Sequence, residues 1–218
     1  RLGAGSRRIS GAELALSAVA SWQPALCLAA PSRSPYSFAP VGDDAARQQL
    51  LQGGDGAPGM AVVSGPILGD AVTADNPVLY APIAIGAIGI GFNIERNPKD
   101  PAPPDAAAIA GVRVATMNLT PRLVAKLLTQ SYGAAVKIYS TPNYPWLSGN
   151  PNHLGRDPDF LRFNPEFTQL QQSDSRTFSS LQLPSGNADA FKQVWQWILS
   201  DPEASSWLRG EPDQWGMK

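Results

Sequence analysis

The chain has 218 residues, 43% of them hydrophobic and 16% charged, which is enough apolar material to bury one large core or two small ones. Lys and Arg number 17 and Asp and Glu number 18, so the near-neutral balance argues against a nucleic-acid partner, which would require a strongly basic surface. The single cysteine excludes an internal disulfide, and 21 Pro with 20 Gly argue against a helical bundle.

Sequence motifs for catalysis are missing. Neither a Gly-x-Ser-x-Gly elbow nor a Walker-type phosphate loop occurs. His153, the only histidine, lies in Asn-Pro-Asn-His-Leu-Gly, which is typical of a solvated turn. Cys27 suits a small buried hydrophobe. We therefore expect no enzyme, no cofactor and no metal site.

The first elements are expected to be a helix, a strand and a second helix. Residues 10–13, Ser-Gly-Ala-Glu, have the spacing of a capping box and predict a helix over about residues 11–22. Residues 36–41 form a short apolar run that predicts a strand. Asp43 and Asp44 follow it and are expected to cap a helix with their carboxylates.

Two further apolar runs, 60–63 and 78–94, are interrupted by Gly and Pro and predict strands buried in a central sheet. Residues 96–105 contain four prolines, which predicts an irregular surface segment near a lobe boundary.

Strand and helix patterns then alternate again. Residues 112–117 predict a strand, and Thr120 with Pro121 is typical of a helix N-terminus. Residues 139–165 are expected to be largely irregular, and the aromatic residues within 160–167 to anchor them by burial.

Two helices are expected near residue 218. The first has one apolar face, formed by Phe191, Val194, Trp195 and Ile198. The second begins at Asp201 and Pro202 and stops at Gly210.

This alternation predicts an α/β fold, in which ligands bind where the carboxyl ends of strands lead into helices. Three loops of small and polar residues occur at such places: 3–6, 42–45 and 173–177. Their backbone N–H groups and their hydroxyl, carboxylate or guanidinium groups suit a small polar ligand. The candidate ligand-binding residues are Gly5, Ser6, Asp43, Ser64, Ser173, Arg176 and Thr177.

In this order the loops resemble those of the phosphate-binding proteins of ABC importers. The segments that carry the resemblance are 3–6, 41–49, 60–67, 78–93, 118–128 and 173–177. The insertion at 139–167 and the ending 207–217 look like a divergent actinobacterial branch of that class.

The resemblance implies a two-lobed, periplasmic-binding-protein-like fold with mixed central sheets flanked by helices. Residues 1–94 would form lobe 1, which a chain return beyond residue 218 would complete, and residues 95–218 would form lobe 2 with the insertion 139–167. It implies a secreted or surface-anchored protein that binds a small polar or anionic ligand in an inter-lobe cleft, delivers it to an ABC transporter permease, and reaches the membrane only through an anchor outside this sequence.

The sequence departs from that family at the ligand loops. Asp43 and Asp44 stand where the family has a serine, and a carboxylate repels phosphate. Ser64-Gly65-Pro66 lacks the family's aspartate, and Gln172 replaces a leading arginine, although Arg176 offers a positive charge nearby. An expected alternative is therefore a non-transport interaction domain with a degenerate anion site. Its contact surface would be the aromatic loop that holds Trp146, Phe160, Phe163 and Phe167.

Overall fold

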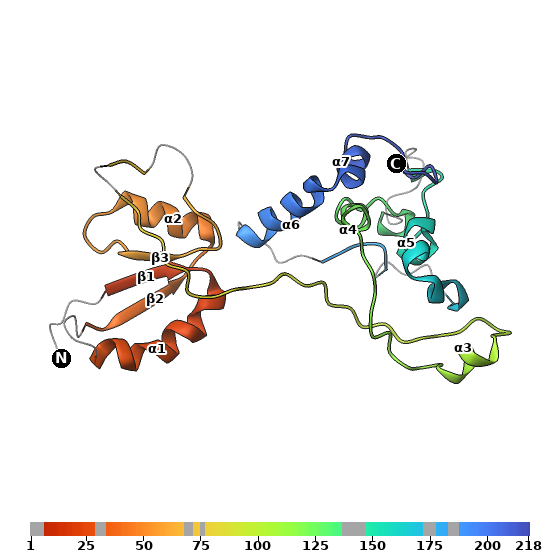
Figure 1. Ribbon diagram of the computed structural model, residues 1–218, viewed down its shortest axis with the longest axis horizontal. Coiled ribbons are helices and arrows are strands. Elements are labelled where there is room, and N and C mark those ends of the chain that lie inside the picture. The colour runs from red at the N-terminus through yellow and green to blue at the C-terminus, as the bar shows by residue number, and fades with distance from the viewer. Residues whose placement is uncertain are drawn as a thin grey trace. The chain divides into compact units, whose positions relative to one another are not determined.

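The computed structural model describes residues 7–28, 34–67, 72–74, 77–136, 147–171, 178–182 and 188–218. The chain divides into two compact units (Figure 1). Unit 1 contains Arg1–Ile88 and Ser185–Val194, and unit 2 contains Gly89–Pro184 and Trp195–Lys218. The division falls slightly before the boundary expected after residue 94, and the segment from Ser185 to Val194 belongs to the first unit.

Unit 1 is built on a parallel three-stranded sheet, so the expected α/β class is confirmed. The strands are β1 (Arg7–Gly11), β2 (Tyr36–Pro40) and β3 (Met60–Val62), arranged in the order β2-β1-β3. In the register, Ile9 of β1 faces Phe38 of β2 and Met60 of β3. Gly11 is required at the end of β1, because a Cβ there would lie 2.1 Å from the carbonyl oxygen of Val62.

Two helices accompany this sheet. Helix α1 (Leu16–Leu28) contacts β2, whereas α2 (Asp43–Gln52) contacts β1 and β3. Figure 1 shows the two helices on opposite sides of the three strands, as right-handed connections require when the chain crosses β1 between β2 and β3.

The predicted capping box at residues 10–13 is wrong. Ser10 belongs to β1, where it pairs with Ala39 on one side and Ala61 on the other. A 3-10 turn over Glu13–Ala15 follows, and its N-cap, Ala12, has no side-chain cap. Pairing with strands distant in sequence has overridden the local helix signal.

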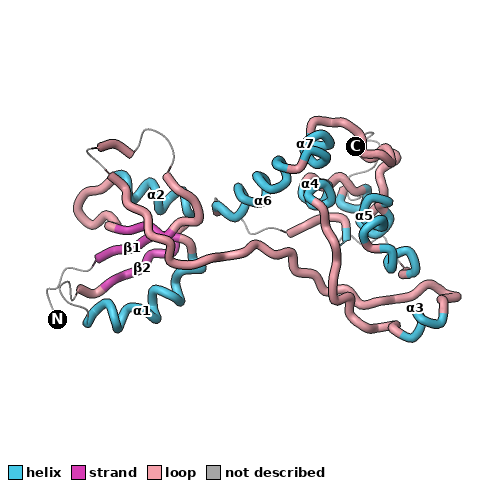
Figure 2. The backbone as a smooth tube through the Cα atoms, viewed as in Figure 1, coloured by secondary structure: helices cyan, strands magenta, loops and turns pink. Residues whose placement is uncertain are grey.

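The strand expected over residues 78–94 is also absent. The described chain from residue 77 to residue 93 has no regular secondary structure, and Figure 2 draws it as loop. Leu79 is 93% exposed and Ile85 is fully exposed, so this apolar run is not the buried strand that its composition predicted.

Unit 2 is mostly helical among its described residues. Helices α3 (Pro104–Ala108), α4 (Pro121–Leu128) and α5 (Pro158–Phe163) alternate with short 3-10 turns at Gly133–Ala135, Leu154–Arg156 and Pro165–Gln169. The strand predicted at 112–117 is reduced to a single antiparallel bridge between Arg113 and Glu95. The segment expected to be irregular over 139–165 contains α5, whose N-cap Asp157 accepts a hydrogen bond from the amide of Asp159.

The start of α4 is as predicted. Thr120 is the N-cap, its hydroxyl accepts a hydrogen bond from the Leu123 amide, and Pro121 is the first helical residue. The helix packs into an apolar core formed by Val114, Leu123, Leu127, Tyr132, Leu154, Phe160, Phe167, Leu170 and Met217. Burial of Phe160 and Phe167 confirms the expected aromatic anchor, whereas Phe163 is 38% exposed and Trp146 lies outside the described residues.

The last two helices are α6 (Asp189–Ser200) and α7 (Pro202–Leu208). As predicted, Asp201 caps α7 by accepting the Ala204 amide, and Gly210 adopts a positive φ just after the helix ends. Among the described residues, no helix is long and apolar enough to span a bilayer.

Candidate functional site

The candidate site lies at the carboxyl edge of the unit 1 sheet. The connections that leave β1 and β2 run through α1 and α2 on opposite sides of the sheet, so the strand order reverses at β1 and its carboxyl end is a topological switch point. The loop after β3 brings Ser64 to this edge, and the loop after β2 brings the first turn of α2, with Asp43. The two residues meet there: the Ser64 amide donates a 3.0 Å hydrogen bond to Oδ1 of Asp43.

Asp43 has a different role from the expected helix cap. The N-cap of α2 is Gly42, without a side-chain cap, and Asp43 is the first residue inside the helix. Its second oxygen, Oδ2, accepts the amide of Asp189 at 3.0 Å. Asp43 is only 3% exposed. Its buried carboxylate therefore links α2 to the loop after β3 and to the start of α6 within unit 1.

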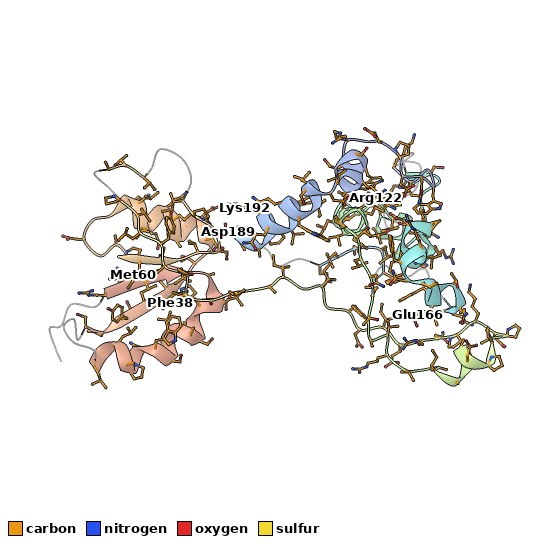
Figure 3. The ribbon with its side chains drawn as sticks, in the orientation of Figure 1. Phe38, Met60, Arg122, Glu166, Asp189 and Lys192 are labelled. Atoms are coloured by element: carbon orange, nitrogen blue, oxygen red, sulfur yellow. The ribbon has the colours of Figure 1, made fainter. Side chains whose placement is uncertain are left out.

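A charged cluster surrounds the Asp43 carboxylate and consists of Asp44, Arg47, Asp189 and Lys192, all in unit 1. The Arg47 guanidinium bonds the Asp44 carboxylate at 2.9 Å, the Gly65 carbonyl at 3.0 Å and the Asp189 carboxylate. Figure 3 labels Asp189 and Lys192 on the first turn of α6. Lys192 Nζ donates to both oxygens of Asp44, at 2.7 and 3.0 Å.

The electrostatics of this cluster follow from those contacts. The hydrogen bond from Lys192 holds the pKa of Asp44 below its usual value, and the same bond raises the pKa of Lys192. Burial opposes the charge on Arg47, but the hydrogen bond and charge of Asp189 outweigh it, so the pKa of Arg47 is raised. Asp44, Arg47 and Lys192 are therefore charged near neutral pH.

The groups at this edge are of two kinds: buried or engaged side chains that hold the edge together, the scaffold, and exposed side chains that a ligand could contact, the rim. Asp43, Arg47 and Asp189 are engaged with one another or with the backbone. Ser64 is exposed, and the side chains of Lys192 and Asp44 are 53% and 38% exposed. The rim therefore presents a hydroxyl, an ammonium and a carboxylate to solvent, a set that suits a ligand carrying hydroxyl groups or charges of both signs.

Of the seven candidate residues, the structure brings together Asp43 and Ser64. Gly5, Ser6, Ser173, Arg176 and Thr177 lie outside the described residues. Sequence reasoning missed the roles of Arg47, Asp189 and Lys192. The i,i+3 spacing of Asp44 with Arg47, and of Asp189 with Lys192, was a visible signal, but the pairing of the two helices was not.

Unit 2 contains a second charged cluster, centred on Lys126 of α4. Its ammonium lies 2.8 Å from Asp157, 3.2 Å from Asp159 and 2.7 Å from Asp213, and all four side chains are completely buried. Tyr132 donates its hydroxyl to Asp157 at 2.8 Å. The three donors of the ammonium thus meet three carboxylates, which is the arrangement of a satisfied structural network.

Arg122 extends this network toward solvent and is labelled in Figure 3. It binds both oxygens of Asp159, at 2.7 and 2.9 Å, and reaches exposed Glu203 at 3.0 Å. Burial opposes ionisation of Asp159, but the hydrogen bonds from Arg122 prevail and its pKa is lowered. Burial and the neighbouring Asp157 raise the pKa of Tyr132 well above its usual value.

Unit 2 also contains a partly open hollow of about 1470 Å³, lined mainly by apolar side chains such as Phe92, Met117 and Phe178. This volume exceeds the range of roughly 300–1,000 Å³ that is usual for small-molecule pockets, and the lining also includes the charged residues Glu95, Lys99 and Arg156. His153 lines it and is fully buried, not solvated as its turn-like sequence predicted. Within the described ranges, no cluster of three or more potential ligating side chains could hold a metal ion.

Comparison with known proteins gives no relative: no family model, no curated protein and no solved structure matches the chain.

Proposed function

We propose that the chain is an extracytoplasmic solute-binding domain of the two-lobed periplasmic type. It binds a small polar or anionic ligand at the carboxyl edge of the unit 1 sheet and serves ABC-type import rather than catalysis. The observation that supports this proposal best is the meeting of Asp43 and Ser64 at the switch point of a parallel sheet, where α/β proteins bind their ligands.

The ligand chemistry follows from the rim. Lys192 attracts an anionic group, and the exposed Ser64 hydroxyl both donates and accepts a hydrogen bond. Asp44 sits 2.7 Å from Lys192 and repels a compact dianion such as phosphate. A ligand that combines an acidic group with hydroxyl or amino groups fits this rim better than phosphate does.

A thermal-shift panel tests the proposal. Phosphate, sulfate, amino acids and sugars are added to the chain, because a ligand that binds only the folded state raises its melting temperature. We expect the largest shift from an amino acid or a hydroxylated acid. Ser64→Ala and Lys192→Met should reduce that shift, whereas Ser200→Ala, at an exposed serine of unit 2, should preserve it. A shift that is unchanged in both rim variants would place the ligand elsewhere.

A second candidate is a non-transport interaction domain on the cell surface. It is favoured by the exposed apolar side chains of the run that begins at residue 77, since surface patches of this kind mark contact sites. No shift with any compound of the panel, in a chain that unfolds cooperatively, would favour this candidate.

A further inference from the structure

The hollow of unit 2 lies against an open side of that unit's apolar core. All of its described lining residues belong to unit 2. Members of the buried core, such as Leu127 and Phe167, form part of its wall. The described apolar side chains that pack against this core while staying partly exposed line the hollow as well, among them Phe92, Met117 and Leu181. A concave apolar wall of this kind favours a ligand that removes it from water.

Aromatic rings hold part of this wall in place. The ring of Phe178, which lines the hollow, stacks on that of Phe167 with centroids 5.8 Å apart and planes 19° from parallel. The ring of Phe160 meets both of them edge-on, at 4.9 Å from Phe167 and 5.8 Å from Phe178. Because these rings pack against one another, a ligand does not have to order them on binding.

A row of polar side chains borders the hollow. Residues 94–99 lie in an extended stretch, in which Glu95 and Pro98 form antiparallel bridges to the segments around residues 113 and 170. The side chains of Glu95, Asn97 and Lys99 are exposed and alternate with less exposed neighbours, as successive side chains of a strand do. All three line the hollow. The hollow therefore has an apolar wall and a polar border.

Lys99 makes one end of this border positive. Its ammonium donates a 2.6 Å hydrogen bond to the Thr168 carbonyl, which holds it beside the hollow and leaves N–H donors for a ligand. Glu95 lies four residues away along the extended stretch, at about 13 Å. That separation exceeds the screening length of about 10 Å at 0.1 M salt, so the carboxylate does not cancel the charge of Lys99. Arg156, which also lines the hollow, is a second cation.

The size of the hollow, about 1470 Å³, favours a long ligand over a compact solute. An acyl chain covers an apolar wall and requires no hydrogen-bond partner there. A peptide would instead bury backbone N–H and C=O groups against apolar side chains, which is costly when those groups stay unpaired.

We propose that this hollow binds an amphiphile with a long acyl chain and an anionic head group. The acyl chain lies against Phe92, Met117 and Phe178, and the head group binds Lys99. The site lies in unit 2 and is separate from the carboxyl edge of the unit 1 sheet, and its ligand differs in chemistry from the polar ligand proposed for that edge.

Fluorescence titration of the 218-residue chain with dansyl-labelled undecanoic acid tests the proposal. We expect saturable binding of the probe and its displacement by tetradecanoate below the micelle concentration. Tetradecyltrimethylammonium carries an acyl-like chain of the same length on a positive head group, and it should displace the probe about tenfold less well because Lys99 repels it. Stronger displacement by tetradecyl phosphate than by tetradecanoate would identify a phosphate head group, and the reverse order a carboxylate; both orders support the site.

Two variants test the assigned contacts. Met117→Trp fills part of the hollow and Lys99→Met removes the cation, so each should raise the dissociation constant of tetradecanoate about tenfold. Lys218→Met, at an exposed lysine outside the hollow, is the matched control and should leave that constant unchanged. An unchanged urea midpoint in Lys99→Met separates the loss of binding from a loss of folding. Tetradecanoate should also shift the amides of Lys99 and Met117 and leave that of Ser64 unmoved.

Three results would overturn the proposal. The first is a probe that does not bind saturably. The second is binding of tetradecanoate that both Met117→Trp and Lys99→Met leave unchanged. The third is equal displacement of the probe by the cationic and the anionic amphiphiles, which would exclude recognition of an anionic head group.

Discussion

Two charged clusters, one in each unit, are built from the same residue types but differ in their contact with water. In unit 1, Lys192 and Asp44 have side chains that are 53% and 38% exposed. In unit 2, the side chains of Lys126, Asp157 and Asp213 are completely buried. Exposed pairs contribute little to stability because water and salt screen them, whereas a buried charge depends on its partners. The first cluster can therefore serve binding, and the second serves the fold.

The largest effect is expected at the buried centre. Lys126→Met leaves buried Asp157 and Asp213 without a cation and Asp159 with Arg122 alone, which should lower the free energy of unfolding by about 3–5 kcal/mol. Urea denaturation followed by tryptophan fluorescence measures this loss. Lys99→Met, at an exposed lysine that donates to the Thr168 carbonyl, is the matched control and should change little. A loss below that of the control would contradict the distinction between the clusters.

Asp43 should rank second, because it is a buried carboxylate at the centre of the unit 1 cluster. Asp43→Ala leaves the amides of Ser64 and Asp189 without an acceptor, at a cost of about 1–3 kcal/mol of stability. Asp43→Asn keeps one oxygen and should lose about half as much. The same denaturation experiment compares both with Asp55→Ala, at an exposed aspartate. Equal losses in the alanine and asparagine variants would show that the two hydrogen bonds are not what holds this edge.

Ser10 offers a smaller effect of opposite sign. Its hydroxyl is buried in β1 and has no hydrogen-bond partner among the described residues. Ser10→Ala removes an unsatisfied polar group and should stabilise unit 1 by about 1 kcal/mol. Ser200→Ala, at an exposed serine, should leave the melting temperature unchanged. A loss of stability in Ser10→Ala would mean that the hydroxyl has a partner in solution, such as a buried water.

The buried cluster of unit 2 should make the chain less stable both at low pH and at high pH. The pKa of Asp159 is lower in the folded chain than the usual 3.8, so its contribution is complete above that value and is lost as the pH falls below it. The pKa values of Lys126 and Tyr132 are raised above 10.5 and 10.0, so their contributions are complete below those values and are lost as the pH rises beyond them. Thermal melts from pH 2 to pH 12 should show both losses, and stability that does not fall above pH 10.5 would contradict the assignment.

The smallest effect is expected at Lys192. Its contacts are exposed, so Lys192→Met should leave the urea midpoint unchanged while reducing ligand binding. A clear loss of stability would mean that the rim is part of the scaffold.

The parts of the fold that the sequence predicted are those encoded within a few residues. Thr120 and Pro121 begin α4, and Asp201 caps α7, because an N-cap side chain and the backbone amide that donates to it lie in the same turn. The same local reasoning failed at Ser10, where β1 pairs with strands on both sides. It failed again at residues 78–94. An apolar run favours burial, but the run alone does not determine whether another segment packs against it.

The place of the candidate site in the fold could be predicted from the sequence, but the contacts of its side chains could not. Small and polar residues after β2 and β3 indicated the carboxyl edge, and Asp43 and Ser64 do meet there. The acceptor role of Asp43 depends on the amide of Asp189, 146 residues away. A contact of that sequence separation leaves no periodic signal, so Asp43 was expected to cap its own helix or to face a ligand.

The most direct test of the proposed binding edge is a titration of the ¹⁵N-labelled chain followed by amide chemical shifts. A ligand that raises the melting temperature should shift the amides of Ser64, Gly65 and Lys192 in a saturable manner, with the midpoint unchanged in Ser200→Ala and weakened in Lys192→Met. Saturable shifts confined to residues of unit 2, with these three amides unmoved, would contradict the assignment of the carboxyl edge of unit 1 as the binding site.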